Sequence, residues 1–95
     1  MRDLTCQYDS RQSFYGKAKV LTTRNTYEMT QELYSYDTLV ASIVWNFSKG
    51  TRTYIYNGKY SQTTTRHQKE FFKQNGLDDK QIKELFKDEK LIVNV

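Results

Sequence analysis

The sequence has no proline, a single cysteine (Cys6) and a single histidine (His67) in 95 residues. One cysteine cannot form a disulfide within the chain, and one cysteine with one histidine cannot supply the ligands of a structural zinc site. No apolar run approaches the roughly 20 residues that span a bilayer, and the first ten residues lack the apolar core of a signal peptide. We therefore expect a cytoplasmic protein that holds no metal or cofactor and does not enter a membrane.

Linkers, repeats and low-complexity segments are also missing, so residues 1–95 are predicted to form a single domain. Aromatic residues make up 15% of the chain, whereas disordered segments contain few of them. A chain of this length buries only about 60–65% of the surface that its unfolded form exposes, so its core must be small.

Residues 1–60 are rich in Thr, Tyr and Val and are predicted to be mainly β-structure. Alternating apolar and polar residues predict strands at 17–22, 27–33 and 51–56, and the nearly continuous apolar run at 39–45 predicts a central strand. Asn57-Gly58 is typical of a tight type I′ turn, because both central residues of that turn need a positive φ. We expect these strands to form an antiparallel meander.

Residues 61–90 are predicted to form two helices. Either Ser61 or Thr65 is suited to cap the first one, and Asn75-Gly76 is a typical helix end. Asp78 with Gln81 fits a capping box at the start of the second helix. Residues 91–95 have the composition of a closing strand. The predicted fold is α+β: a small curled antiparallel sheet of about four to five strands packed against a C-terminal helical hairpin.

The positive charge is unevenly distributed along the chain. The net charge is +4 and the isoelectric point is near 9.2. No acidic residue occurs between Asp37 and Glu70, and none occurs between Asp9 and Glu28, although both stretches carry several Lys and Arg. These cations predict a local positive potential, which is typical of proteins that bind nucleic acid or an acidic protein surface.

Tyrosines interleave with the cations in the stretch between Asp37 and Glu70. The candidate binding surface comprises Lys49, Arg52, Tyr54, Tyr56, Lys59, Tyr60, Arg66 and Lys69. Tyr54 and Tyr56 share one face of their predicted strand, and together with the cations they have the composition of a platform that stacks bases and contacts phosphates. The alternative is a solvated sheet face on which the tyrosine rings pack across strands.

The sequence contains no catalytic motif, and we predict that the protein is not an enzyme. His67 lacks a partner at a spacing that would join it to a carboxylate or nucleophile, so it is interpreted as a histidine at the edge of the core, bonded to backbone or to a neighbouring hydroxyl. The hydroxyl-rich segment 61–66 lacks the glycines of a phosphate-binding loop, and helix capping is favoured over anion binding there.

Two short motifs stand out, SY-x-T-x-VA in a predicted strand and YS-x-TT-x-RH at the start of a predicted helix. They comprise Ser35, Tyr36, Thr38, Val40, Ala41, Tyr60, Ser61, Thr63, Thr64, Arg66 and His67. This paired pattern resembles that of a family of small uncharacterised proteins of phages and other bacterial mobile elements. The resemblance spans residues 33–76 at most, and the family brings no established activity.

The resemblance implies a phage protein that binds a host machine, such as an inhibitor of a CRISPR effector. A basic chain does not mimic DNA, so such an inhibitor would contact guide RNA, DNA or an acidic side of the effector. The same motifs also have a structural interpretation. Tyr36 and Tyr60 would pack over the helix start, while Thr38 and Arg66 would hold the strand to the helix.

These observations together predict a non-enzymatic accessory protein of a phage or mobile element. It is expected to bind and inhibit a bacterial defence complex, most plausibly a CRISPR effector ribonucleoprotein, in the cytoplasm of the bacterial host. The alternative is a small module that binds DNA or RNA without such a target. The protein is expected to be a monomer or a homodimer, the latter through an unpaired edge at residues 91–95.

Overall fold

The Thr-, Tyr- and Val-rich first part of the chain forms five strands in the computed structural model, which describes residues 1–94. Two helices and a sixth strand follow. The elements are β1 (Arg2–Asp3), β2 (Ala18–Arg24), β3 (Glu28–Ser35), β4 (Thr38–Asn46), β5 (Thr51–Tyr56), α1 (Gln62–Gln74), α2 (Asp79–Asp88) and β6 (Lys90–Asn94). The predicted strands and both predicted helices are thus confirmed to within a few residues.

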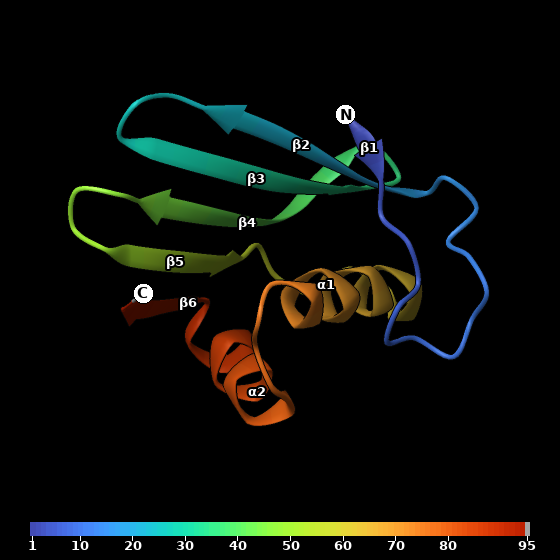
Figure 1. Cartoon of the computed structure of the whole chain (residues 1–95). Helices are drawn as coiled ribbons and strands as arrows, with labels where there is room; N and C mark the ends of the chain where they lie inside the picture. Colours follow the sequence, from blue (N-terminus) through green and yellow to red (C-terminus); the bar gives the residue numbers. More distant parts are fainter. Residues whose placement is uncertain (95) are drawn as a thin grey trace.

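The six strands form one antiparallel sheet in the order β1-β2-β3-β4-β5-β6 (Figure 1). The chain leaves this meander after β5 to form the helices and then returns, so that β6 pairs with β5 and Ile92 lies opposite Thr53. The α+β class is confirmed. The sheet has more strands than the four to five expected because the two-residue β1 pairs with β2 at the edge. Val95, the end of the predicted closing strand, lies outside the described residues.

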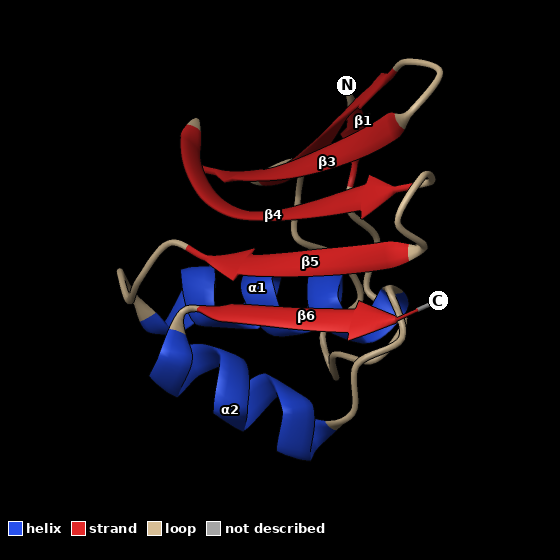
Figure 2. Cartoon of the chain, turned by 90° about the vertical axis from the view of Figure 1, so that its left-hand side faces the viewer, coloured by secondary structure: helices blue, strands red, loops and turns tan. Residues whose placement is uncertain are grey.

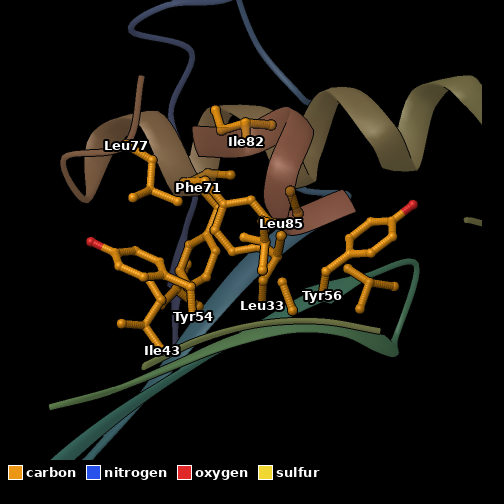
Figure 3. Close-up of a cluster of buried hydrophobic side chains, with 14 of the residues drawn as sticks. Leu33, Ile43, Tyr54, Tyr56, Phe71, Leu77, Ile82 and Leu85 are labelled. Carbon is orange, nitrogen blue, oxygen red and sulfur yellow. The ribbon is translucent and has the colours of Figure 1, made fainter. Parts of the chain in front are cut away.

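Both helices pack on the same face of the sheet, as Figure 2 shows for α1 and α2 beside β5 and β6. Residues of β5 alternate, and Tyr54 and Tyr56 point toward the helices while Thr53 and Ile55 point away. Tyr54 contacts Phe72 of α1 edge-on, with ring centroids 6.2 Å apart, and Tyr56 stacks on Phe86 of α2 at 4.4 Å. The core therefore lies between the sheet and the helices (Figure 3).

Each helix begins at a side-chain cap. Ser61 caps α1, because its hydroxyl oxygen accepts the Thr64 N–H at 3.1 Å, whereas the Thr65 hydroxyl donates to the Ser61 carbonyl. The predicted capping box of α2 is confirmed. The Asp78 carboxylate accepts the Gln81 N–H at 2.8 Å, and the Gln81 side chain accepts the Asp78 N–H at 3.0 Å. A cap of this kind contributes about 1 kcal/mol.

The tight turn predicted at Asn57-Gly58 is absent. Of Asn57 and Gly58 only the glycine has a positive φ, so the predicted type I′ turn there is wrong, and this segment instead leads from β5 into α1. The side chain of Gln68 holds the segment by donating to the carbonyls of Val40 and Gly58, both at 3.0 Å. Both residues of the two-residue connection between β3 and β4, Tyr36 and Asp37, have positive φ.

The long segment between β1 and β2 (residues 4–17) folds beside α1 (Figure 1). Its Leu4 and Phe14 side chains are buried in the core. The buried carboxylate of Glu70 on α1 accepts the N–H groups of Tyr8 and Asp9, each at 2.8 Å. This segment is therefore attached to α1 at both its apolar and its polar positions.

Among residues 1–94, neither helix has the length and apolar character needed to cross a bilayer.

Candidate functional site

The predicted tyrosine platform is not exposed. The Tyr54 side chain is 0% exposed and that of Tyr56 is 7% exposed, because both lie on the face of β5 that the helices cover (Figure 3). Burial raises the pKa of both phenols, with the Arg52 charge acting in the opposite direction on Tyr54 and Glu89 raising that of Tyr56 further. The prediction that these two rings stack on a partner is therefore wrong.

Arg52 also lies on the covered face of the sheet. Its guanidinium donates to the Asn75 carbonyl at 3.3 Å and lies 5.5 Å from the centre of the Tyr54 ring. Asn75 is the C-cap of α1, where carbonyl groups lack helical partners and a positive charge is favourable. Arg52 thus stabilises the end of α1, and its charge is not free for a partner.

The other five predicted residues are at the surface but do not form one patch. Lys49 lies in the turn between β4 and β5, whereas Lys59 and Tyr60 lie in the segment that leaves the opposite end of β5 (Figure 1). Arg66 and Lys69 lie on α1. Whether any of them contacts a partner stays a prediction.

A different set of cations gathers beside the first half of α1. Arg11, Lys17 and Arg66 come from three distant parts of the chain and line one cavity of about 170 Å³. The remaining lining residues are Ser13, Phe14, Tyr15, Tyr36, Thr63 and His67, so the lining contains three cations and no carboxylate. Arg11 and Lys17 belong to the first acid-free stretch of the sequence. Sequence reasoning noted their charge but did not place them in the site, because only the docking of residues 4–17 brings them to Arg66.

Two tyrosines beside this cavity have a strained backbone. Tyr15 has a φ of 53° and Tyr36 a φ of 50°, in the left-handed region that bulky residues avoid. Each occupies the first central position of a two-residue turn in which both φ angles are positive, as in a type I′ turn. Such a conformation costs about 1–3 kcal/mol per residue and often marks functional positions. The side chains are 76% and 52% exposed, so both strained positions present an aromatic ring at the surface.

A chain of hydroxyl groups connects the start of α1 to His67 at the inner wall of the cavity. The Ser61 hydroxyl donates to the Thr64 oxygen, which is 2.9 Å from the Ser35 oxygen, and Ser35 is 2.8 Å from Nδ1 of His67. Each hydroxyl has one hydrogen to donate, so when Thr64 donates to Ser35 and Ser35 donates to Nδ1, the ring hydrogen of His67 is on Nε2. The interpretation of His67 as a core-edge histidine bonded to a hydroxyl is confirmed.

The charge state of His67 follows from its burial. Burial lowers the pKa of the imidazole, nearby Asp9 raises it and Arg11 lowers it. The ring is therefore neutral at physiological pH. Ser35 is 2% exposed and His67 is 0% exposed, so the serine–histidine pair is buried in this structure and ties β3 to α1.

A larger hollow adjoins the cavity. It has a volume of about 590 Å³ and is lined by Met1, Gly16, Lys17, Lys19, Tyr34, Tyr36 and Asp37. Lys19 and Tyr34 are paired in the β2–β3 register and lie on the sheet face opposite to the helices. Lys17 and Tyr36 line both spaces, and they therefore form the wall between them.

The two motifs of the sequence resemblance meet at this site. Ser35 comes from the first motif, whereas Thr64 and His67 come from the second. The predicted tie through Thr38 and Arg66 is replaced by this hydroxyl chain, and Arg66 pairs instead with Asp9 at 3.3 Å. Tyr36 lies over the His67 ring at 5.9 Å between centroids, consistent with the predicted packing near the helix start.

Other reactive groups do not form a site. Among residues 1–94 no three His, Cys, Asp or Glu side chains come close enough to hold a metal ion. Cys6 is half-buried, and burial together with the Asp9 and Glu70 charges raises the pKa of its thiol, with Arg11 opposing them. A raised pKa disfavours the reactive thiolate.

The fold defines a small α+β domain in which two helices cover one face of a six-stranded antiparallel sheet. Residues 2–88 match a family of unknown function, DUF8033, and the chain belongs to that family. No curated protein and no solved structure matches the sequence.

Proposed function

We propose that the protein is a non-enzymatic nucleic-acid-binding protein that contacts its partner around the start of α1. The α1-start surface consists of Arg11, Lys17, Lys19, Arg66, Tyr15 and Tyr36. The observation that carries the proposal is the convergence of Arg11, Lys17 and Arg66 on one cavity that contains no carboxylate and is flanked by exposed tyrosines.

The electrostatics of this surface favour a polyanion. The first turn of α1 contains no acidic residue, so the partial positive charge of the helix N-terminus adds to that of the cations. Asp9 offsets part of the Arg66 charge through their ion pair. The side chains of Arg11 and Lys17 make no ion pair within the described residues, which leaves both free to contact phosphates.

The exposed tyrosines supply the second component of such a surface. Bases of single-stranded nucleic acid stack on aromatic rings, and each stacking contact contributes about 1–3 kcal/mol. Tyr36 and Tyr15 stand next to the cations rather than beneath the helices, unlike Tyr54 and Tyr56. The α1-start surface therefore combines cations with tyrosines as the sequence predicted, but it shares only Arg66 with the residues predicted from the sequence.

The test measures binding to single-stranded DNA and RNA of the same sequence at several salt concentrations by fluorescence anisotropy. We expect the double variant Arg11→Glu/Lys17→Glu to lose binding and keep its melting temperature, since both side chains are exposed. The neutral variant Arg11→Gln/Lys17→Gln should lose two phosphate contacts. The slope of log binding constant against log salt concentration should then fall in magnitude by about 1.4.

The control is Lys80→Glu/Lys83→Glu on the exposed side of α2, which changes the net charge by the same amount as the double reversal. This control is expected to bind with little change. Equal losses in both reversals would show that only net charge matters and would refute the α1-start surface.

The defence-inhibitor function implied by the sequence resemblance is our second proposal, and the basic α1-start surface supports it because guide RNA is a partner of complementary charge. A phage protein of this kind would act in the cytoplasm of the bacterial host. The test recovers partners of the tagged protein from a bacterial lysate with and without nuclease treatment. A defined effector complex that survives nuclease supports inhibition, whereas bulk nucleic acid alone refutes it.

A further inference from the structure

We propose that the two adjoining spaces form one site for a nucleotide that carries a terminal phosphate. The phosphate lies in the smaller cavity among Arg11, Lys17 and Arg66, and the base lies in the larger hollow against Tyr34 and Tyr36. This inference rests on the proposed function and specifies the part of the nucleic acid that the α1-start surface recognises.

The volumes of the two spaces match these two parts of a nucleotide. A water molecule takes up about 30 Å³ of liquid, so the 170 Å³ cavity holds one small group with a few waters. Sites for whole organic ligands have volumes of about 300–1,000 Å³, and the 590 Å³ hollow falls in that range. A phosphate fits the first space, and a base with its sugar fits the second.

The shared wall allows one ligand to occupy both spaces. Lys17 and Tyr36 line the cavity as well as the hollow, so a group bound in one space is adjacent to the other. Lys19 adds a second cation on the hollow side, while Asp37 is the acidic residue of the hollow. The phosphate is thus favoured on the side of the wall that lacks a carboxylate.

The inner wall of the cavity holds a polar atom without a partner. Nε2 of His67 is buried and makes no hydrogen bond within the described residues, although Nδ1 is bonded to Ser35. In the tautomer in which Ser35 donates to Nδ1, the ring hydrogen is on Nε2 and this atom is a donor. A buried donor without a partner is rare in folded proteins, and an anionic ligand at the cavity wall is one explanation for it.

In this proposal, movement of the Tyr36 ring controls access of the phosphate to Nε2 of His67. Phe14 contacts His67 edge-on at 4.5 Å, and the Tyr36 ring lies tilted by 34° beside it at 5.9 Å between centroids. The Tyr36 side chain is 52% exposed, so its ring is able to rotate toward the hollow, where a base would stack on it. Stacking would in this way uncover Nε2 for a phosphate oxygen.

A terminal phosphate is favoured over one within a strand. A strand that continues in both directions needs an exit on each side of the phosphate, but His67 and Phe14 belong to the buried core behind the cavity. A terminal phosphate also carries up to two negative charges, which suits three cations better than the single charge of a phosphodiester.

The experiment compares one single-stranded oligonucleotide with a 5′-phosphate, with a 3′-phosphate and with hydroxyls at both ends. We expect at least one phosphorylated form to bind about tenfold more tightly than the hydroxyl form, because charge-assisted hydrogen bonds to the phosphate are strong. Arg11→Gln with Lys17→Gln should remove this advantage. Tyr34→Ala should weaken all three oligonucleotides by the same factor.

A nuclear magnetic resonance measurement adds an independent readout on the native chain. The Nε2 resonance of His67 should shift when the phosphorylated oligonucleotide is added and should stay unchanged with the hydroxyl form. A nucleoside monophosphate and inorganic phosphate serve as further probes, and they distinguish a free nucleotide from a strand end as the source of the phosphate.

The outcomes separate this inference from the proposed function. If all three oligonucleotides bind equally and binding is lost in Arg11→Glu/Lys17→Glu, the terminal-phosphate site is refuted and the nucleic-acid function stands. If none of them binds, both proposals are refuted. If the phosphorylated form binds more tightly but His67 does not respond, the phosphate lies outside the cavity and the site as described is wrong.

Discussion

His67 shows how much one buried residue depends on its surroundings. Its Nδ1 atom is satisfied by Ser35, whereas its Nε2 atom is buried without a partner. A protonated imidazole would carry a charge in a buried environment of low polarity, which is unfavourable. Burial therefore lowers the pKa of His67. In the unfolded chain the same side chain titrates near its ordinary value of 6.5.

This difference in pKa predicts the pH dependence of stability. Below about pH 6.5 the unfolded chain binds a proton that the folded chain does not, so the free energy of unfolding falls as the pH falls. Above that pH both states are neutral at this residue and its contribution is constant. We expect the contribution to decline from about pH 6.5 downward by at most about 1.4 kcal/mol per pH unit.

Urea denaturation of the protein and of His67→Gln between about pH 8 and about pH 5.5 measures this contribution. The glutamine variant removes the titrating group and keeps a hydrogen-bonding side chain, so its stability should change less across the same interval. Parallel pH profiles for the two proteins would mean that His67 has the same pKa in the folded and unfolded states.

At the scale of elements, the end of α1 is held by the sheet on which it packs. The carbonyl of Asn75 accepts hydrogen bonds from the Tyr54 hydroxyl and from the Arg52 guanidinium, both on the inner face of β5. The backbone then turns sharply at Gly76, whose φ of +94° suits glycine. The two β5 residues that seemed to form a binding surface in the sequence therefore stabilise the helix instead.

Tyr54→Phe tests this role because it removes the hydroxyl and keeps the buried ring. We expect the free energy of unfolding to fall by about 0.5–1.5 kcal/mol, the usual contribution of one hydrogen bond, with nucleic-acid binding unaffected. Tyr34→Phe is a matched control on the other face of the sheet, where the hydroxyl makes no hydrogen bond within the described residues. Equal stability of Tyr54→Phe and the parent protein would show that the Asn75 carbonyl gains nothing from the phenol.

At the scale of the whole molecule, the sequence predicts local structure better than the site. Period-two alternation located the strands, and hydroxyl and carboxylate caps located the helices, because these signals involve neighbouring residues. Alternation also placed Tyr54 and Tyr56 on the same face. It does not say which face the helices cover, however, and that choice decides whether the rings are exposed or buried.

The cavity at the start of α1 was beyond sequence reasoning for a related reason. Arg11 and Arg66 meet only because the segment 4–17 is attached to α1 by contacts between residues about sixty positions apart. No pattern of neighbouring residues predicts such a contact. The sequence did identify the acid-free stretches that contain these cations, so the electrostatic character of the site was predictable and its position was not.

Glu70 supports the site from outside it, because its carboxylate holds the segment that carries Arg11. Glu70 is 2% exposed, and its carboxylate accepts hydrogen bonds from the N–H groups of Tyr8 and Asp9. Without it these two donors have no acceptor on α1, and the hydrogen bonds that still hold this part of the segment to the helix within the described residues are Arg66–Asp9 and Gln74–Thr5. Removal of the Glu70 carboxylate should therefore weaken the cavity, although Glu70 does not line it.

We expect Glu70→Ala to abolish the slow hydrogen exchange of the Tyr8 and Asp9 amides while the β3 and β4 amides in the sheet stay protected. Hydrogen bonds to a charged acceptor contribute about 1.5–3 kcal/mol, so local opening should precede global unfolding. Nucleic-acid affinity should fall as in Arg11→Gln/Lys17→Gln, even though the variant makes the protein more positive. Glu84→Ala on the exposed side of α2 makes the same change of charge and should leave both measurements unaltered. Tighter binding in both variants would show instead that net charge, and not the position of the attached segment, governs the interaction.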